Sequence, residues 1–310
     1  MKRREFLIKS LAAGGLLAAG STMPVQTAMA VEPKKFKVKP TDDNWVIISD
    51  LHTNPGAYQD EYLQRAVADI LKLTPRPTHV IALGDIAYLT GQLKEYQRAR
   101  EILAPIWEAG IQLTIGMGNH DRREVFAQVF PEIAAKSVLK NSLTYVVEGK
   151  NADFIVLDSL QEGEDKKSWF VDGALDDEQK QWLADRLKHQ TKPVFVSSHH
   201  PLNEIKIARM LMECPQCAGY IHGHDHRWRL DWTHIDYQRL RVLPILCVPS
   251  TGHWGDIGLV RFVMESDKAT AYLCQKEFFF PRPQKPEDTP ILWKEITDSH
   301  SGAICPFRYK

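Results

Sequence analysis

The alternation of hydrophobic and polar positions predicts strands and helices that follow one another through the first two thirds of the chain. Short uninterrupted apolar runs bounded by turn residues are typical of buried strands, and apolar residues spaced three or four apart are typical of helices. Strand-like runs occupy residues 44–50, 78–85, 111–118, 143–149, 152–159, 192–200 and 218–222. Helical spacing occupies residues 58–73, 92–108, 122–139 and 176–190, and Asp176 can cap the last of these helices with Gln179 three positions on.

The pattern changes in the last third of the chain. From residue 227 to residue 278, strand-like segments alternate with turns, and helical spacing does not recur. Buried strands that alternate with helices favour a largely parallel sheet layered with helices. The later strand-rich half is predicted to add a second sheet packed on the first. The predicted fold class is therefore α/β, with a two-sheet sandwich flanked by helices.

Both ends of the chain depart from this pattern. Residues 1–30 have a basic start that includes Arg3 and Arg4, a weakly apolar middle rich in Gly and Ala, and a small-residue ending, AMA. This composition is typical of a cleaved signal peptide, and the arginine pair resembles the twin-arginine export signal. An ordinary secretory signal and an uncleaved anchor are the alternatives. We therefore expect export to the periplasm by the twin-arginine machinery, a folded domain over 31–280, and a Pro-rich surface extension over 281–310.

Composition narrows the classes of partner. The chain has 310 residues, of which 44% are hydrophobic and 25% charged, and Lys+Arg and Asp+Glu both total 39. This balance provides no general attraction for nucleic acid or anionic lipid. The apolar runs that follow residue 30 are too short to span a bilayer, so the mature chain is expected to have no membrane span. The sequence leaves the oligomeric state open.

The five cysteines are odd in number, so at least one lacks a partner within the chain. Cys214 and Cys217 have the spacing of a redox or zinc motif, but no second pair follows. We expect either a surface disulfide or two unreactive thiols rather than a redox centre. Cys247 and Cys274 fall in apolar strand-like runs and are predicted to pack in the core.

Polar residues stand where the predicted strands end. In open α/β sheets, sites form in the crevice beyond the carboxyl ends of the strands. Carboxylate, amide and imidazole groups occur at five such ends, and no thiolate is among them. These donors exceed what one ion needs, and they suit two ions that share a carboxylate. The candidate ligands are Asp50, His52, Asp85, Asn119, His199, His224 and His226.

The order of these motifs resembles that of the calcineurin-like metallophosphoesterases. That family has the pattern D-x-H, G-D, G-N-H-D, a His at a later strand end and G-H-x-H, and this chain matches it without substitution. The branch of class III cyclic-nucleotide phosphodiesterases is the nearest in pattern, through LDS at 157–159, SSHHPL at 197–202 and VPSTG at 248–252. The likeness covers about residues 45–265 and implies the α/β/β/α architecture of the family.

The resemblance also implies how the ligands divide between two divalent ions. One ion is held by Asp50, His52, Asp85 and His226, and the other by Asp85, Asn119, His199 and His224, so that Asp85 bridges them. Mixed nitrogen and oxygen donors admit Mn, Fe, Zn or Co. His199 is preferred to His200 because the family places its ligand two positions before the proline. His222 precedes the motif and is expected to pack in the strand or lie behind the ligands.

The resemblance implies hydrolysis of a small phosphodiester or phosphomonoester. Two divalent ions lower the pKa of a shared water, and the resulting hydroxide attacks phosphorus in line. His120 then stabilises the transition state or protonates the leaving oxygen, and Asp121 could orient His120 through a hydrogen bond. A strict cyclic-nucleotide phosphodiesterase is an alternative that export argues against. A catalytically silent metal-binding scaffold on the same fold is another.

Three further residues accompany the motifs. Tyr88 lies three positions after Asp85, as the metal-binding tyrosine does in purple acid phosphatases. Those enzymes lack the histidine that this chain has at His52, so Tyr88 is predicted to form a wall of the site. His253 and Trp254 either line the pocket or serve turn and packing roles, and the sequence leaves this open. It also leaves open the substrate, whose recognition falls to loops such as 160–174 and 202–217.

Overall fold

The structure is a computed structural model that describes residues 38–163, 170–236, 241–279 and 304–309. The chain divides into Met1–Phe36 and Lys37–Lys310, and the described residues all belong to the second unit. The predicted signal peptide, residues 1–30, lies outside the described residues. Among the residues that are described, no helix combines the length and the apolar character needed to cross a bilayer.

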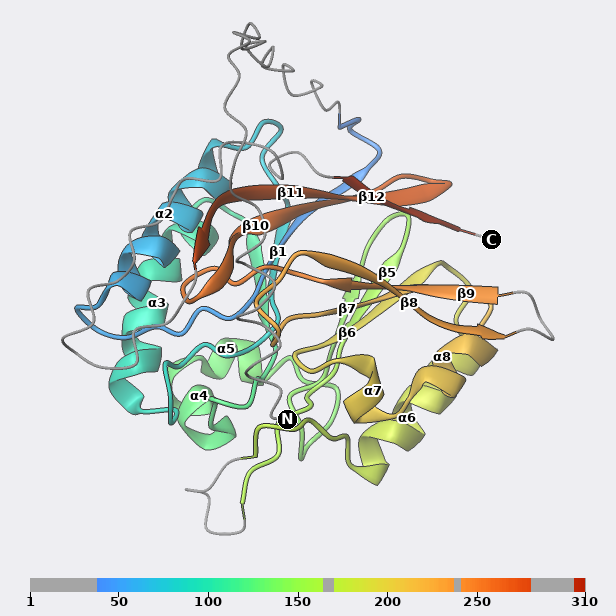
Figure 1. Cartoon of the computed structure of the whole chain (residues 1–310), viewed down its shortest axis with the longest axis horizontal. Coiled ribbons are helices and arrows are strands. Elements are labelled where there is room, and N and C mark those ends of the chain that lie inside the picture. Colours follow the sequence, from blue (N-terminus) through green and yellow to red (C-terminus); the bar gives the residue numbers. More distant parts are fainter. Residues whose placement is uncertain (1–37, 164–169, 237–240, 280–303, 310) are drawn as a thin grey trace, which may run out of the picture. The chain divides into compact units, whose positions relative to one another are not determined.

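The described part of the chain contains two sheets of six strands each (Figure 1). The first sheet has the order β12-β11-β10-β1-β2-β3, and the second has the order β4-β5-β6-β7-β9-β8. The strands of the first sheet are β1 (Asp43–Ile48), β2 (His79–Ala82), β3 (Gln112–Ile115), β10 (Gly255–Met264), β11 (Lys268–Phe279) and β12 (Ile304–Arg308). Those of the second sheet are β4 (Tyr145–Glu148), β5 (Asp153–Val156), β6 (Val194–Ser198), β7 (Cys217–His222), β8 (Arg229–Asp236) and β9 (Arg241–Cys247).

Parallel strands occur in both sheets. Strands β1, β2 and β3 run parallel, as do β5, β6, β7 and β9, so each sheet gathers several carboxyl ends at one edge. The predicted class, a two-sheet α/β sandwich with flanking helices, is confirmed. The assignment of strands to sheets differs from the expectation, because β10 pairs antiparallel with β1 in the first sheet. Val260–Met264 of β10 is buried on both faces, which suits a strand inside a sheet rather than at its edge.

The end of the chain also differs from the expected surface extension. Strand β12 pairs antiparallel with β11, and Phe307 lies opposite Ala269. Phe307 is fully buried, with its ring 5.2 Å from Phe195 and 5.7 Å from Phe262. Burial of this aromatic side chain places the last strand in the core. The preceding part of the predicted extension, residues 281–303, lies outside the described residues.

The core between the sheets is aromatic. Successive residues of a strand face opposite sides, and in β5 and β6 the phenylalanines Phe154 and Phe195 face the first sheet. Phe154 lies 6.3 Å from Trp45 of β1, and Phe195 lies 4.9 Å from Phe262 of β10, measured between ring centroids. The alternate residues of these strands, such as Ile155 next to Phe154, face the helices instead. The two sheets are thus held face to face by large side chains.

Helices cover the outer faces of the two sheets. Figure 1 shows α2 and α3 on one side of the sheets and α6, α7 and α8 on the other. A second apolar cluster joins α6 to α8 with the second sheet, and includes Leu183, Leu187 and Leu211. The described helices are α2 (Tyr58–Lys72), α3 (Leu93–Glu108), α4 (Arg123–Val129), α5 (Pro131–Ala134), α6 (Asp177–Lys188), α7 (Leu202–Ile205) and α8 (Ala208–Glu213).

The helix predictions hold in most places and fail in two. The predicted cap is present, because the Asp176 carboxylate accepts a hydrogen bond from the Gln179 backbone at 2.7 Å. The predicted helix over 122–139 is divided into α4 and α5, because Pro131 cannot donate a backbone hydrogen bond and instead begins a new helix. The predicted loop over 202–217 contains α7 and α8, which are too short to show a clear helical period.

Candidate metal centre

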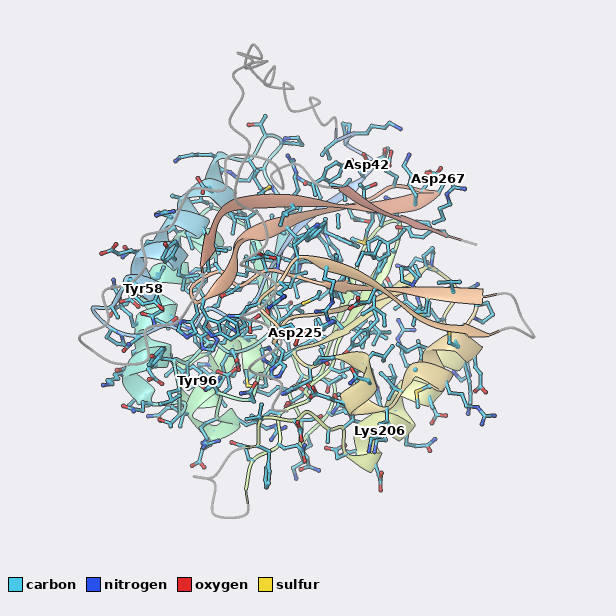
Figure 2. All side chains as sticks on the ribbon, in the orientation of Figure 1. Asp42, Tyr58, Tyr96, Lys206, Asp225 and Asp267 are labelled. Atoms are coloured by element: carbon cyan, nitrogen blue, oxygen red, sulfur yellow. The ribbon has the colours of Figure 1, made fainter. Side chains whose placement is uncertain are left out.

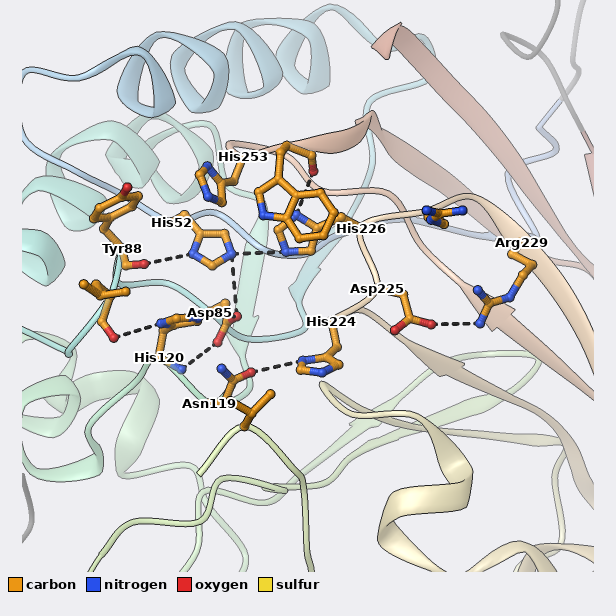
Figure 3. A pocket seen from close by; sticks show the side chains of 14 residues that line it. His52, Asp85, Tyr88, Asn119, His120, His224, Asp225, His226, Arg229 and His253 are labelled. Carbon is orange, nitrogen blue, oxygen red and sulfur yellow. Dashed lines mark hydrogen bonds and ion pairs between the residues drawn. The ribbon is translucent and has the colours of Figure 1, made fainter. Parts of the chain in front are cut away.

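The first group of candidate ligands comes from the ends of β1, β2 and β7. Asp50 and His52 follow β1, Asp85 follows β2, and His226 lies in the loop after β7. The His226 Nε2 atom is 3.1 Å from Asp50 Oδ1 and 3.3 Å from His52 Nε2. His52 Nε2 is in turn 3.6 Å from Asp85 Oδ2. These four buried side chains, which are the first predicted ligand set, converge on one point. Figure 3 shows three of them, His52, Asp85 and His226.

The second group comes from the ends of β2, β3, β6 and β7. His199 Nε2 is 3.2 Å from Asp85 Oδ2 and 3.2 Å from Asn119 Oδ1. His224 Nδ1 is 3.1 Å from Asn119 Oδ1 and 3.3 Å from His199 Nε2. The structure therefore brings the second predicted set together as well. The Asp85 carboxylate belongs to both groups, which is the position that a shared ligand requires.

Contacts across the two sheets bring these loops together. The His199 Nδ1 atom is 3.0 Å from the Leu83 carbonyl, which joins the end of β6 to the end of β2. The His224 backbone N–H lies 3.2 Å from both Asp50 carboxylate oxygens. A Cβ atom at Gly223 would collide with the side chains of Ser49 and Asp50. Glycine at this position permits the close approach of the β7 loop to β1.

The backbone at the site is unusual. Among the described non-glycine residues with positive φ, only Lys206 lies outside the predicted ligand set. Such conformations cost about 1–3 kcal/mol each and cluster at functional sites, where the surrounding structure enforces them. Five of the seven candidate ligands therefore lie in tight loops with this strained backbone. The ligands concerned are Asp50 (φ 53°), His52 (φ 44°), Asp85 (φ 50°), His224 (φ 68°) and His226 (φ 53°).

Backbone carbonyls fix the tautomers of three candidate ligands. The Nδ1 atoms of His52, His199 and His226 each lie within hydrogen-bond distance of a carbonyl oxygen, to which only an N–H can donate. A proton therefore lies on Nδ1, and Nε2 is the nitrogen that faces the carboxylates and can bind a metal when the imidazole is neutral, as in metal-binding histidines. The accepting carbonyls are those of Tyr88 at 3.1 Å, Leu83 at 3.0 Å and Trp254 at 2.7 Å, respectively.

His200 differs from its neighbour His199. Its Nδ1 atom is 2.7 Å from Ser159 Oγ, and its Nε2 atom is 3.0 Å from the Val171 carbonyl. Both ring nitrogens are therefore engaged by protein groups. Distance alone would group His200 with His199 and His224 as ligands. Because the ring nitrogens of His200 are already engaged, His199 is favoured as the ligand. His200 instead holds the segment around Val171 through its hydrogen bond to the carbonyl.

The buried carboxylates of the site favour positive charge beside them. Burial alone would raise the pKa of Asp50 and that of Asp85, but the charges of His226 and His199 outweigh burial and lower both pKa values. Burial likewise opposes protonation of His199, yet Asp85 and Asp50 raise its pKa to about 9. A protonated His199 cannot ligate a metal. Divalent cations would supply the charge and leave Nε2 free, so these nitrogen and oxygen donors fit such ions.

His120 stands at the wall of the cavity beside the shared carboxylate. Its Nδ1 atom is 2.8 Å from the Leu89 carbonyl, and its Nε2 atom is 4.0 Å from Asp85 Oδ2. The backbone N–H of His120 donates to Asp85 Oδ1 at 2.9 Å. The side chain is 18% exposed, so it can reach a bound molecule. This position fits a group that exchanges a proton with substrate.

The prediction that Asp121 orients His120 through a hydrogen bond is wrong. The Asp121 carboxylate is fully buried and accepts from the Tyr96 hydroxyl at 3.0 Å (Tyr96 is labelled in Figure 2), while the Leu89 carbonyl occupies His120 Nδ1. Burial and the nearby Asp85 charge raise the pKa of Asp121 to about 6. Asp121 therefore joins the loops after β2 and β3. The Asp121 carboxylate also accepts hydrogen bonds from the backbone N–H groups of Ile86 at 3.1 Å, Ala87 at 3.1 Å and Gly118 at 2.9 Å.

A cavity of about 630 Å³ opens over the two ligand groups. Tyr88 lines it, as predicted for a wall residue. His253 and Trp254, which the sequence left open, also line it, and Trp254 stacks on His226 with 4.5 Å between ring centroids. The sequence prediction omitted the cavity residues Arg227 and Arg229, although the signal was present in two arginines directly after the GHDH motif.

The remaining residues singled out in the sequence lie outside this cavity. His222 is buried in β7, and its Nδ1 atom is 2.8 Å from the Gly223 carbonyl, which fits the expected packing role. Cys214 and Cys217 are buried thiols that form no disulfide, so the expected surface disulfide is not present. Cys247 is buried and Cys274 is half-buried, broadly as expected for strand positions facing the core.

With this geometry established, comparison with known proteins identifies the family. The family model of calcineurin-like phosphoesterases matches residues 45–228, which is more than half of the chain. The chain therefore belongs to the calcineurin-like phosphoesterase family.

Two curated relatives are named probable cyclic nucleotide phosphodiesterases. The one from Rhodopseudomonas palustris is 31% identical over 51% of this chain and 57% of its own length. The one from Synechococcus is 30% identical over 41% of this chain and 46% of its own length. The chain thus spans about half the length of the curated relatives that it matches.

Solved structures share the fold. PhoD superposes with a TM-score of 0.56 at 14% identity, covering 87% of this chain and 70% of PhoD. GAP50, described as the anchor in the inner membrane complex of Plasmodium, superposes with a TM-score of 0.50 at 11% identity, covering 82% of this chain and 88% of GAP50. At such low identity these likenesses concern the fold alone.

Proposed function

We propose that this protein is a dinuclear metal-dependent phosphoesterase that hydrolyses a small phosphodiester or phosphomonoester. The observation that carries the proposal is the position of the Asp85 carboxylate between two groups of nitrogen and oxygen donors. A single carboxylate that faces both groups is what two neighbouring cations share in hydrolytic centres. Membership of the calcineurin-like phosphoesterase family supports the same reaction class.

The proposal assigns the ligands to two divalent cations. Asp50, His52 and His226 would hold one cation together with Asp85, and the remaining candidates, Asn119, His199 and His224, would hold the other with Asp85. Such cations, when bound, lower the pKa of a water and neutralise charge on phosphoryl oxygens. The neutral Asn119 amide limits the negative charge of the ligand set. The donor types admit Mn, Fe, Zn or Co.

His120 acts on the substrate in this proposal. The Leu89 carbonyl holds the ring in place through Nδ1, so Nε2 presents its proton to the cavity when the imidazole is charged. A protonated Nε2 at this wall would donate to the leaving oxygen or to a phosphoryl oxygen in the transition state. Asp121 acts indirectly, because it fixes the loops that carry Asp85 and His120.

Hydrolysis of chromogenic esters tests the proposal. The purified protein is treated with chelator, reloaded with Mn²⁺ or Zn²⁺, and assayed with bis(p-nitrophenyl) phosphate and p-nitrophenyl phosphate. We expect turnover of at least one ester that requires metal. Binding of two ions per chain without turnover of either ester would contradict the proposal and favour a silent scaffold. That outcome is a real alternative, because one fold can support different functions.

A cyclic-nucleotide phosphodiesterase is the second candidate. The names of the two relatives favour it, although the chain covers only 57% and 46% of their lengths. Hydrolysis of 3′,5′-cyclic AMP in the same assay decides between the two. A kcat/KM for cyclic AMP well above that for the chromogenic diester would favour the second candidate, and the reverse would favour a broader phosphoesterase.

Location outside the cytoplasm is also a proposal. It is supported by the composition of residues 1–30, with Arg3 and Arg4 ahead of a weakly apolar stretch. Replacement of both arginines by lysine should leave the protein in the cytoplasmic fraction of a bacterial host, whereas the unchanged chain should reach the periplasm. Export that persists in the double variant would exclude the twin-arginine route.

A further inference from the structure

Two arginines line the cavity beside the candidate metal centre, and among the described residues only Arg229 is in an ion pair. The Arg229 guanidinium is 2.8 Å from Asp225 Oδ2 and 2.6 Å from Asp231 Oδ2 (the pair with Asp225 is drawn in Figure 3). Arg227 is exposed and also lines the cavity. Within the described part of the chain, the structure gives the Arg227 side chain no hydrogen bond, ion pair or ring contact.

Among the described residues, no carboxylate of the cavity wall forms a direct ion pair with Arg227. The cavity lining contains two carboxylates, Asp85 and Asp225, among the described residues. Asp85 faces the candidate ligand histidines, and Asp225 pairs with Arg229, which also pairs with Asp231. Neither lining carboxylate forms an ion pair with Arg227. A guanidinium in this position presents a planar set of donors that matches the oxygens of a carboxylate or a phosphate.

The backbone that carries Arg227 is held on both sides. The His226 carbonyl accepts a hydrogen bond from the Asp256 backbone at 2.8 Å, and the Trp228 backbone donates to the Asp256 carboxylate at 2.7 Å. His226 itself is fixed by the Trp254 carbonyl at 2.7 Å. The guanidinium therefore extends from a pinned position next to a candidate metal ligand, and only its side chain must be ordered when an anion binds.

We propose that Arg227 binds a second anionic group of the substrate. This group is carried on the part of the ester that stays bonded to phosphorus when the leaving group departs. The site then selects phosphoesters that bear an additional carboxylate or phosphate-like group over esters that bear the scissile phosphate alone. This inference rests on the proposed phosphoesterase function and specifies its substrate class.

A matched series of esters tests the inference. The substrates are p-nitrophenyl phenyl phosphate and its two analogues with a carboxylate or a phosphonate at the meta position of the phenyl ring. All three release p-nitrophenol, so the added anion is the only variable. Binding of phenylphosphonate and 3-carboxyphenylphosphonate to the Mn²⁺-loaded protein, measured by calorimetry, provides a second readout that needs no turnover.

We expect the added anion to raise kcat/KM by about tenfold, mainly through a lower KM, since the contact is remote from the reacting atoms. Arg227→Gln should abolish this preference, and Arg227→Lys should retain part of it. Arg209→Gln is the matched control, because Arg209 is an exposed arginine on α8 that pairs with Glu213 and lies outside the cavity lining. The control should retain the full preference.

The outcomes distinguish failure of the role of Arg227 from failure of the proposed function. Equal kcat/KM values for all three esters in the wild type would overturn the role of Arg227, as would a preference that survives Arg227→Gln. A preference for the phosphonate ester alone would narrow the class to phosphate-like groups, and one for the carboxylate ester alone would narrow it to carboxylates. If no ester is hydrolysed, the proposed function fails. Calorimetry then supports the inference on Arg227 if 3-carboxyphenylphosphonate binds more tightly to the wild type but not to Arg227→Gln, and overturns it otherwise.

Discussion

The core between the two sheets and the edge that holds the candidate ligands are both largely buried but built in opposite ways. The core joins Trp45, Phe154, Phe195 and Phe262 from regular strands through ring contacts. The edge gathers carboxylates and imidazoles, mostly on residues with positive φ. Apolar burial stabilises the first region. Strain and buried charge destabilise the second, and bound cations would offset that cost.

Two buried histidines show the same contrast. His79 packs against Trp45 with 5.4 Å between ring centroids and lies 2.9 Å from Thr114 Oγ1. Burial lowers the pKa of His79 to about 4. His199 is also buried, but the carboxylates of Asp85 and Asp50 overcome burial and raise its pKa to about 9. The neighbours decide the charge of each imidazole, and the edge is the region that attracts positive charge.

Asp85→Asn should have the largest effect on activity. A neutral amide in place of the shared carboxylate weakens both proposed cation positions, so metal content should fall at both. Turnover should fall on the order of 10³-fold or more, since a bound metal contributes several kcal/mol to transition-state stabilisation. Metal analysis and steady-state kinetics measure the two quantities.

Asp153→Asn is the matched control for this prediction. Asp153 is equally buried, at the start of β5, and pairs with Lys192 at 2.6 Å, away from the candidate ligands. This control should lose stability but keep its metal. An Asp85→Asn protein that retained two ions and full turnover would show that Asp85 is not the shared ligand.

His120→Ala should separate catalysis from metal binding. The side chain is placed to exchange a proton with substrate and is not a proposed ligand, so metal content should stay constant. Turnover should fall by about 10²–10⁴-fold, the usual contribution of general acid–base catalysis. Unchanged kinetics in the metal-loaded variant would remove His120 from the mechanism.

Phe195→Ala tests the other region. Removal of this ring from the core between the sheets should lower the free energy of unfolding by about 3–5 kcal/mol. The chemistry of the edge is untouched, so kcat of the folded, metal-loaded fraction should stay within a few-fold of the wild type. Urea unfolding and activity at low temperature provide the two measurements. A loss of metal with little loss of stability would contradict the separation of the two regions.

In the metal-free protein, His79 and His199 should contribute pH-dependent losses of stability in opposite directions. The pKa of His79 is about 4 when folded and about 6.5 when unfolded, so stability falls as the pH drops from 6.5 to 4. The pKa of His199 is about 9 when folded, so its contribution is complete below pH 6.5 and is lost as the pH rises to 9.

Metal should suppress the alkaline loss that His199 contributes, because a ligand His199 is already neutral. Unfolding free energies measured with chelator and with Mn²⁺ across this range compare the two regions directly. His199→Gln should reduce the alkaline slope in chelator and leave the acid slope in place. An alkaline slope that is unchanged by both metal and the substitution would show that His199 does not carry it.

The sequence predicted the positions of most strands and helices because their apolar periods are long and regular. It also predicted which residues end the strands, and the structure brings all seven candidate ligands together. The pairing of β10 with β1 and the burial of Phe307 in β12 could not be predicted, because an apolar run does not specify its neighbour in a sheet. Tertiary contacts decide that choice.

The roles of particular side chains were harder to predict than their proximity. Asp121 follows His120 in the sequence, but its carboxylate turns toward the backbone of the loop after β2. The carbonyls that fix the histidine tautomers carry no sequence signal, since every residue has one. Arg227 and Arg229 look alike in sequence, and only the placement of Asp225 and Asp231 shows that one of them is paired.

The position of bound metal tests the central claim most directly. Anomalous scattering from crystals of the Mn²⁺-loaded protein should show two peaks about 3.5–4 Å apart, with the Asp85 carboxylate between them and His199 and His226 on opposite sides. A single peak, or peaks that lie away from the joined edges of the two sheets, would contradict a dinuclear centre built on Asp85.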